Sequence, residues 1–398
     1  MNSFFSRRNE SIDILRGLTM LLMVFVNDLW TVPGVPHFLE HFERLEDGMG
    51  VSDVVFPMFL FAMGMSIPYA IERRFSKGYS GESTLGHILT RTLALLLMGA
   101  FTVGAEGAVD STVGYGENAF TLLMVAGFFL VWNTYRDGMK AKKWLQCLGI
   151  AILAFLAFTF RTPEGRYFSA QWWGILGLIG WAYCFSAVTY LLARKTPGRI
   201  VVVWFCLCAV NLLVTRMRDG SQIIHGHSLL SDFTGALRIG NAPNTVMAVG
   251  GMLLSLAENR FSSRSASFRA ASAFVLAVLL AAGAAVTHHW WIISKLVGTL
   301  PWCLYVSSIS VAVYAVLRIM EAYGKTGWFR PFKVSGTATL SVYMMPYVIY
   351  SVLAIFGIYT FDFLGEFGAF ALLKCVLFSF LCVGLTSLLV KAGAKLKI

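Results

Sequence analysis

The sequence predicts an all-α, polytopic helical membrane protein, with about twelve transmembrane helices and both termini in the cytoplasm. Of its 398 residues, 57% are hydrophobic and only 13% are charged, whereas a soluble domain carries roughly 25% charged residues. The mean hydropathy is +0.69, and apolar stretches long enough to cross a bilayer, about 17 to 25 residues, recur along the chain. Because lipid offers the backbone no hydrogen bonds, these stretches are expected to be helices.

The predicted spans are separated by short clusters of Lys, Arg, Gly and Pro. Their approximate bounds are 17–33, 53–72, 86–106, 119–135, 144–160, 175–193, 200–215, 244–258, 271–287, 301–320, 337–357 and 369–390. The polar start of the chain lacks the cleavage site of a secretory signal, so the first span is expected to remain as an anchor. No soluble domain is recognisable, and residues 1–398 are expected to form a single transmembrane domain.

Positive charge is unevenly shared between the two sets of segments that alternate between these spans. One set, which includes both termini, holds 24 of the 32 Lys and Arg residues, and the other set holds seven. Short cytoplasmic loops are rich in Lys and Arg, so the first set is expected in the cytoplasm. This distribution accounts for the net charge of +11 without a nucleic-acid partner. We expect a multi-pass protein of a bacterial-type inner membrane.

The cysteines give no sign of a metal site or a disulfide framework. All seven fall inside predicted spans: Cys147, Cys184, Cys206, Cys208, Cys303, Cys375 and Cys382. None has metal-ligand spacing, and a disulfide framework would need them in loops, so we interpret them as small apolar side chains and expect no metal.

The segments predicted to lie outside carry more reactive side chains than the inner ones. They hold six of the seven histidines: His37, His41, His225, His227, His288 and His289. Asn27 and Asp28 lie near the outer end of the first span, and Asp53 begins the second span from the same side. A histidine beside a carboxylate can act as a general base. The alternative, about equally supported, is that Asp53 caps a helix and His41 is a polar loop residue.

The segment from Ser11 to Ile67 resembles the start of the heparan-α-glucosaminide N-acetyltransferase family and its bacterial relatives, which are described as N-acetylglucosamine-related transporters or domains of unknown function. The resemblance rests on S-I-D-I-L-R-G at 11–17, M-V-F-V-N at 23–27 and D-V-V-F-P-M-F-L-F-A-M-G at 53–64. A weaker likeness occurs at P-F-K-V-S-G-T-A-T-L-S-V-Y, residues 331–343. Residues 171–183 depart from the family, because they lack the Arg of its G-V-L-Q-R pattern.

The resemblance implies an acyltransferase-like domain that moves an acetyl group from cytoplasmic acetyl-CoA to the amine of a glucosamine-type sugar on the periplasmic side. It implies catalytic roles for Asn27, Asp53 and a histidine in the loop between them. His41 is the better match because it is nearer Asp53 in sequence, and His37 remains the alternative. His41 would take a proton from the amine or accept the acetyl group itself, and Asn27 would hydrogen-bond the thioester carbonyl.

Other residues are weaker candidates for binding the two substrates. The polar groups expected to contact the sugar are Asp28, Glu43, His225, His227 and Asn241. The cations expected to hold CoA are Arg16, Arg91, Arg330 and Lys333, although the positive-inside bias is a sufficient explanation for each. The expected partners are a small amino sugar and membrane lipid, with a homodimer left open.

Two rival functions remain open on the sequence alone. A secondary transporter of amino sugars also fits about twelve spans, although transporters carry ionisable residues or broken helices deep in several spans. O-acylation of a surface polysaccharide is the second rival, because the sequence does not separate N- from O-acylation.

The charge asymmetry generates a prediction about topology. In a cysteine-free background, the cysteine of Glu40→Cys should react with a membrane-impermeant thiol reagent in intact cells, and that of Lys140→Cys should react only after the cells are opened. The reverse pattern would overturn the orientation and the assignment of the active side.

Overall fold

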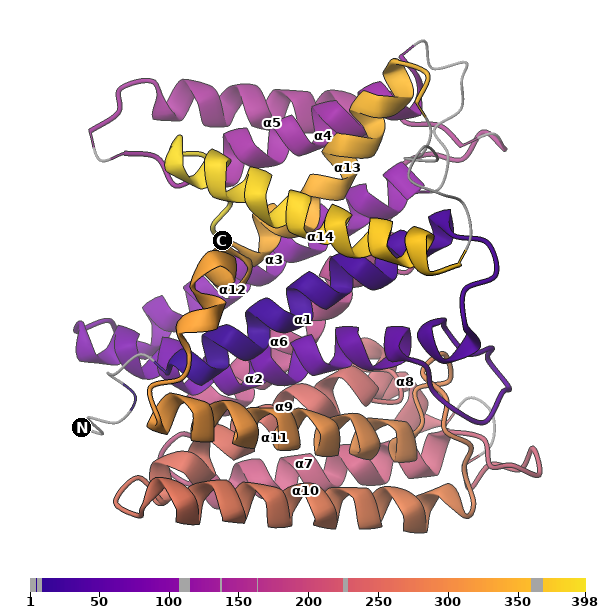
Figure 1. The fold of residues 1–398 in the computed structure, drawn as a ribbon, viewed down its shortest axis with the longest axis vertical. Coiled ribbons are helices and arrows are strands. Elements are labelled where there is room, and N and C mark those ends of the chain that lie inside the picture. The colour runs from indigo at the N-terminus through magenta and orange to yellow at the C-terminus, as the bar shows by residue number, and fades with distance from the viewer. Residues whose placement is uncertain are drawn as a thin grey trace. The chain divides into compact units, whose positions relative to one another are not determined.

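The computed structural model describes residue 5 and residues 9–106, 115–136, 138–162, 164–224, 228–358 and 368–398. In this part of the chain the regular elements are helices, apart from two isolated β-bridges, between Asn133 and Leu396 and between Arg161 and Tyr167 (Figure 1). The predicted all-helical architecture is therefore confirmed for the described residues.

The helices are numbered in chain order. The α-helices are α1 (Glu10–Asp28), α2 (Val51–Ser76), α3 (Gly81–Glu106), α4 (Gly116–Trp132), α5 (Lys142–Thr159), α6 (Gly174–Ala193), α7 (Pro197–Val214), α8 (Leu229–Ala236), α9 (Pro243–Arg260), α10 (Ala266–His288), α11 (Leu300–Ala322), α12 (Lys333–Thr337), α13 (Thr339–Ile355) and α14 (Gly368–Lys391). Three short 3-10 helices are η1 (Leu29–Thr31), η2 (His37–Leu39) and η4 (Gly327–Phe332).

Every predicted span overlaps a helix, but the helices differ in how well they suit a bilayer. In the described residues, eight helices are long and apolar enough to cross a membrane, or nine if the bent pair Gly327–Thr337 and Thr339–Ile355 is one span. Three predicted spans fall outside even the larger set of nine: α4, which is apolar but has only 17 residues, α1 and α9. A helical multi-pass membrane protein is thus supported, while the count of twelve and the side of the termini stay predictions.

The chain divides into two compact units. Unit 1 consists of Met1–Thr19, Pro36–Thr92 and Trp181–Lys333, and unit 2 consists of Met20–Val35, Leu93–Gly180 and Val334–Ile398. Each unit thus combines segments that are far apart in sequence. The prediction of a single domain over residues 1–398 remains a prediction.

Unit 1 is built on close helix packing. α2 packs along α9, and α10 packs along α11. Where α2 meets α9, glycines face backbone: a Cβ added at Gly64 would overlap the carbonyl oxygen of Ala248, and one at Gly251 would overlap that of Phe61. The Ser255 hydroxyl also donates to the Met65 carbonyl oxygen at 2.8 Å. Small residues at a helix interface let backbones approach closely, which is how helices associate in lipid.

The two ends of unit 1 have different chemistry. At the end where α9 and α11 finish, Arg318 lies 3.5 Å from Glu258 and 2.7 Å from Glu321, and Arg269 lies 3.6 Å from Glu258. At the other end, the segments before α2 and before α11, both predicted to lie outside, contact each other directly. Segments that the charge pattern assigned to one side are therefore neighbours within this unit.

Unit 2 contains α4, which packs against α5 and α13, and α13 also packs against α14. A polar contact joins two of its segments, because the Tyr350 hydroxyl donates to Oδ1 of the buried Asp28. The Tyr350 ring also lies 5.0 Å from the Phe378 ring, centroid to centroid.

The contact between α2 and α9 generates a stability prediction. Gly64→Ala should destabilise the protein by about 1–3 kcal/mol, because the new methyl group must displace a backbone carbonyl rather than a flexible side chain. Gly86→Ala is the matched control: this helical glycine has open space around its Cβ position, so alanine should be neutral or stabilising by up to about 1 kcal/mol. Thermal unfolding of the detergent-purified variants measures both, and equal melting temperatures would contradict the close packing.

Candidate active site

The start of α2 orders a carboxylate through backbone hydrogen bonds. Asp53 is the third residue of this helix, and its Oδ2 accepts from the N–H of Gly50 at 3.1 Å and from the N–H of Phe42 at 3.0 Å. The position of residue 50 requires glycine, because a Cβ there would overlap the carbonyl oxygen of Glu40. Asp53 therefore does cap the start of α2, as the alternative drawn from the sequence holds. This capping uses only Oδ2, one of the two carboxylate oxygens.

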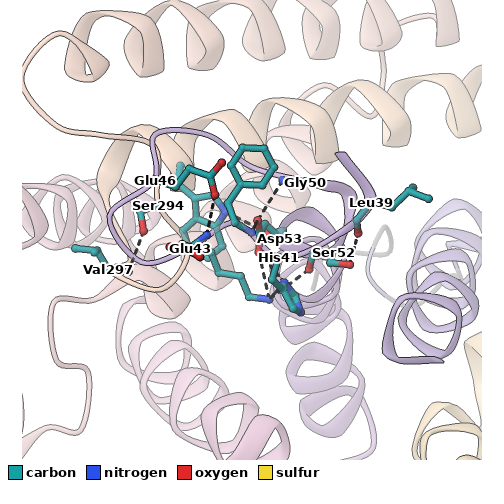
Figure 2. A network of polar contacts seen from close by, with 12 residues as sticks. Leu39, His41, Glu43, Glu46, Gly50, Ser52, Asp53, Ser294 and Val297 are labelled. Atoms are coloured by element: carbon teal, nitrogen blue, oxygen red, sulfur yellow. Dashed lines mark hydrogen bonds and ion pairs between the residues drawn. The ribbon is translucent and has the colours of Figure 1, made fainter. Parts of the chain in front are cut away.

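The other carboxylate oxygen contacts a histidine. His41 Nδ1 lies 2.7 Å from Asp53 Oδ1 (Figure 2). The His41 side chain is 50% exposed, while that of Asp53 is only 1% exposed. In the described part of the chain, His41 Nε2 has no hydrogen-bond partner. A buried carboxylate that binds one ring nitrogen fixes the tautomer and leaves the second nitrogen available to a ligand.

A lysine completes this cluster, and sequence reasoning did not select it. Lys295, between α10 and α11, places Nζ 3.1 Å from His41 Nδ1, 3.7 Å from Asp53 Oδ1 and 3.3 Å from the carbonyl oxygen of Ser52. Burial lowers the pKa of Lys295 to about 8, although the charge of Asp53 acts in the opposite direction. One signal in the sequence pointed to it, since Lys295 is the single lysine among the seven cations assigned to the outer segments.

Asp47 holds the segment that carries His41 against the segment that carries Lys295. Its Oδ1 accepts from the N–H of Ile293 at 2.8 Å and lies 2.9 Å from His288 Nε2, and its Oδ2 lies 2.6 Å from Arg218 Nη2. Burial opposes the charge of Asp47, but the hydrogen bonds and the nearby Arg218 outweigh it and lower the pKa of this carboxyl group.

Backbone contacts reinforce this junction. The Gly48 N–H donates to the Ile293 carbonyl oxygen at 3.0 Å, and the Ser294 hydroxyl donates to the Arg44 carbonyl oxygen at 2.9 Å. In one segment of the junction these bonds involve residues on both sides of Asp47, and in the other they involve the two residues just before Lys295. The distance between His41 and Lys295 is therefore set by a network of bonds rather than by one flexible side chain.

His37 has a different environment from His41. Its Nε2 lies 2.6 Å from Glu46 Oε1, and its ring stacks on Phe42 with centroids 4.2 Å apart. The hydrogen bond to Glu46 raises the pKa of His37. The structure thus pairs Asp53 with His41 and not with His37, although which of them is the base remains a prediction.

The remaining candidates at the end of α1 lie in unit 2. Asn27 is exposed, whereas Asp28 is 2% exposed. Asp28 Oδ1 accepts from the Tyr350 hydroxyl, and Oδ2 has no hydrogen-bond partner among the described residues. Their predicted roles in catalysis and in sugar binding remain predictions.

The other predicted sugar-binding residues have varied surroundings. The Glu43 side chain is exposed beside the His41 segment. The Asn241 amide donates to the carbonyl oxygens of Val297 at 2.7 Å and Gly298 at 3.1 Å, so it supports the turn after Lys295. His225 and His227 lie outside the described residues.

The four predicted CoA-binding cations lie on four different elements. Arg16 on α1 contacts Asp13 at 2.8 Å, and Arg91 on α3 lies over the Tyr183 ring at 4.7 Å. Arg330 in η4 and Lys333 at the start of α12 are exposed. Their role toward CoA stays a prediction. Among the described residues, no group of three or more His, Cys, Asp or Glu side chains is arranged to hold a metal ion.

Comparison with known proteins supports the resemblance read from the motifs. Over residues 8–228, more than half of the chain, the sequence matches a family described as a domain of unknown function (DUF5009). It is also similar to two proteins named heparan-alpha-glucosaminide N-acetyltransferase. The mouse (Mus musculus) protein is 35% identical over 98 residues, which are 25% of this chain and 14% of that protein. The human (Homo sapiens) protein is 35% identical over 96 residues, or 24% and 14%.

The network around Asp47 generates a prediction about local stability. Asp47→Asn should speed backbone hydrogen exchange in residues 289–299, because the amide that replaces the carboxylate loses the charge that holds Arg218 and His288. Losing such a charge-assisted hydrogen bond costs about 1.5–3 kcal/mol, or at least a tenfold increase in local opening. Glu43→Gln, at an exposed side chain of the same segment, is the control. Unchanged exchange in Asp47→Asn would show that this carboxylate does not hold the two segments together.

Proposed function

Since the chain belongs to the family described as a domain of unknown function (DUF5009), we propose a specific activity for it, that of a transmembrane N-acetyltransferase. It would move an acetyl group from cytoplasmic acetyl-CoA to the amine of a glucosamine-type sugar on the periplasmic side of a bacterial-type inner membrane. The observation that carries the proposal is the 2.7 Å contact between His41 Nδ1 and the buried Asp53 carboxylate. The partial similarity to the two N-acetyltransferases supports it.

The acceptor chemistry explains why such a pair is needed. The amine of an amino sugar is largely an ammonium ion near neutral pH and must lose a proton before it can attack a thioester. His41 Nε2 would take that proton, while Nδ1–H donates to Asp53 Oδ1 and the carboxylate stabilises the imidazolium. The burial of Asp53 strengthens this interaction, because charges attract more strongly away from water.

In the transfer step one bond forms and one bond breaks. The amine nitrogen attacks the thioester carbonyl carbon and forms the C–N bond, the C–S bond breaks, and the CoA thiolate leaves. The proton held on His41 passes to the thiolate, and the neutral ring then takes the second proton that the nitrogen must lose to become an amide. The ring releases this proton to the solvent, so each transfer yields the amide, CoA and one proton. The alternative order, in which His41 Nε2 first accepts the acetyl group, uses the same residues in two steps.

Asn27 would hydrogen-bond the thioester carbonyl oxygen as negative charge develops on it. This role rests on the resemblance of M-V-F-V-N to the family motif. Glu43 and Asp28 are proposed to contact the amino sugar, and Arg16 and Arg91 to contact the phosphates of CoA, because each has a charge of the required sign.

One observation favours the rival transporter function. Asp28 and Lys374 are both 2% exposed within unit 2, and buried ionisable groups in membrane segments often mark ion or solute pathways. The two functions differ in product: a transporter accumulates unchanged sugar, whereas an acetyltransferase releases CoA and an acetylated sugar.

The deciding experiment supplies radiolabelled acetyl-CoA to purified protein in proteoliposomes with a panel of amino sugars. The proposal predicts a labelled amide product and release of CoA. Product that is cleaved by alkaline hydroxylamine, which leaves an amide intact, would be an ester and would favour O-acylation. In a parallel assay with a radiolabelled amino sugar, uptake of the sugar without acetylated product would favour the transporter and reject the proposal.

His41→Ala should lower acetyl transfer by about a hundredfold to ten-thousandfold, the usual effect of losing a general base. The variant should still fold but unfold at a lower temperature, because the buried Asp53 Oδ1 loses its partner at 2.7 Å and keeps only Lys295 at 3.7 Å. His37→Ala is the matched control and should retain most activity, since its ring contacts Glu46 rather than Asp53. If His37→Ala is inactive and His41→Ala is active, the roles of the two histidines are exchanged. If both variants transfer acetyl groups at the parent rate, the histidine-base mechanism is wrong.

A further inference from the structure

Lys295 approaches the same ring nitrogen that binds Asp53. Its Nζ lies 3.1 Å from His41 Nδ1, and its side chain is 20% exposed. The Ser52 carbonyl oxygen at 3.3 Å and Asp53 Oδ1 at 3.7 Å also surround the nitrogen. Both the Lys295 ammonium nitrogen and the Asp53 carboxylate therefore lie next to Nδ1 of the His41 ring.

The chemistry of Nδ1 decides what this contact is. A neutral imidazole has one N–H donor and one acceptor nitrogen, so Nδ1 cannot donate to a carboxylate and accept from an ammonium at the same time. The shorter distance, 2.7 Å to Asp53 Oδ1, requires a proton between the two atoms. Nδ1 therefore carries that proton, and Lys295 is a cation beside the ring rather than a donor to it.

The charges around the ring oppose each other. Asp53, from α2, favours the imidazolium form of His41, and Lys295, from the segment between α10 and α11, disfavours it. On the segment before α2, Glu46 is paired with His37 at 2.6 Å. If Asp53 were the only charged group beside His41, it would favour a ring that is already protonated when the acceptor arrives. A protonated ring cannot take another proton.

We propose that Lys295 is a positioning residue that keeps the His41 ring neutral, with its Nδ1–H directed to Asp53 and its Nε2 free to accept a proton. The inference rests on the proposed function, which makes His41 a base. The lowered pKa of Lys295, about 8, agrees with it, since the ammonium form dominates at neutral pH and is lost only as the pH rises through that value.

The direct test measures the protonation of His41 without any acetyl transfer. Diethyl pyrocarbonate modifies the neutral imidazole, and mass spectrometry follows its rate at His41 as a function of pH in the purified protein. In Lys295→Met the midpoint at His41 should rise by about one pH unit or more, because the opposing cation is gone and Asp53 remains. Lys295→Arg keeps the cation and should restore the parent midpoint. His289, an exposed histidine in the same protein, is the internal control and should not shift.

Activity gives a second readout. The acidic limb of the pH profile for acetyl transfer in Lys295→Met should move upward with the His41 midpoint, so that the rate falls about tenfold at pH 6 and much less at pH 8. Lys295→Gln serves as a second neutral variant if Lys295→Met fails to fold. An unshifted His41 midpoint in a folded neutral variant, or an activity loss that is equal at every pH, would overturn the proposal. A parent protein with no acetyl transfer would reject the proposed function, while the modification experiment would still test Lys295.

Discussion

The buried carboxylate of Asp53 is the group on which the organisation of this end of unit 1 depends. It is 1% exposed, and a buried charge is costly unless every part of it is satisfied. The N–H groups of Phe42 and Gly50 satisfy one oxygen, and His41 and Lys295 satisfy the other. The start of α2, the path of the preceding segment and the position of the ring therefore depend on one another.

A second carboxylate, that of Asp47, holds in place the segments that carry the partners of Asp53. Asp47 joins the segment before α2 to the segment before α11 through the Ile293 N–H, His288 and Arg218. Without this junction, both the backbone around Lys295 and its long side chain would have to be ordered to reach the ring, and the contact with His41 would have to offset that whole loss of conformational entropy. Holding the backbone in place first makes the contact at His41 less costly. A functional group built in this way stays in position because its supporting segments are bonded to each other.

The helices could be predicted from the sequence because an apolar stretch of sufficient length has one way to satisfy its backbone in lipid. The pairing of Asp53 with His41 could also be anticipated, because only 12 residues separate them and the family motif includes Asp53. Lys295 could not, because 254 residues separate it from His41 and the contact exists only once α2 and α11 are packed in unit 1. The amide nitrogen of Asn241 donates to two backbone carbonyl groups, a structural role that spacing does not reveal, and its proposed contact with the sugar stays a prediction.

The arrangement of charge also bears on how a cationic acceptor would be treated on the proposed function. The segment before α2 carries Glu40, Glu43 and Glu46, and their field attracts an ammonium ion over a screening distance of about 8–10 Å. At contact distance the sign is reversed, because Lys295 already occupies the space beside Asp53. An acceptor that could bind Asp53 directly would form a stable ion pair and keep its proton. With Lys295 in that position, the ammonium ion would contact Nε2 of His41 instead, and the Asp53 carboxylate, bonded to Nδ1, would stabilise the charge that the ring takes up with the proton.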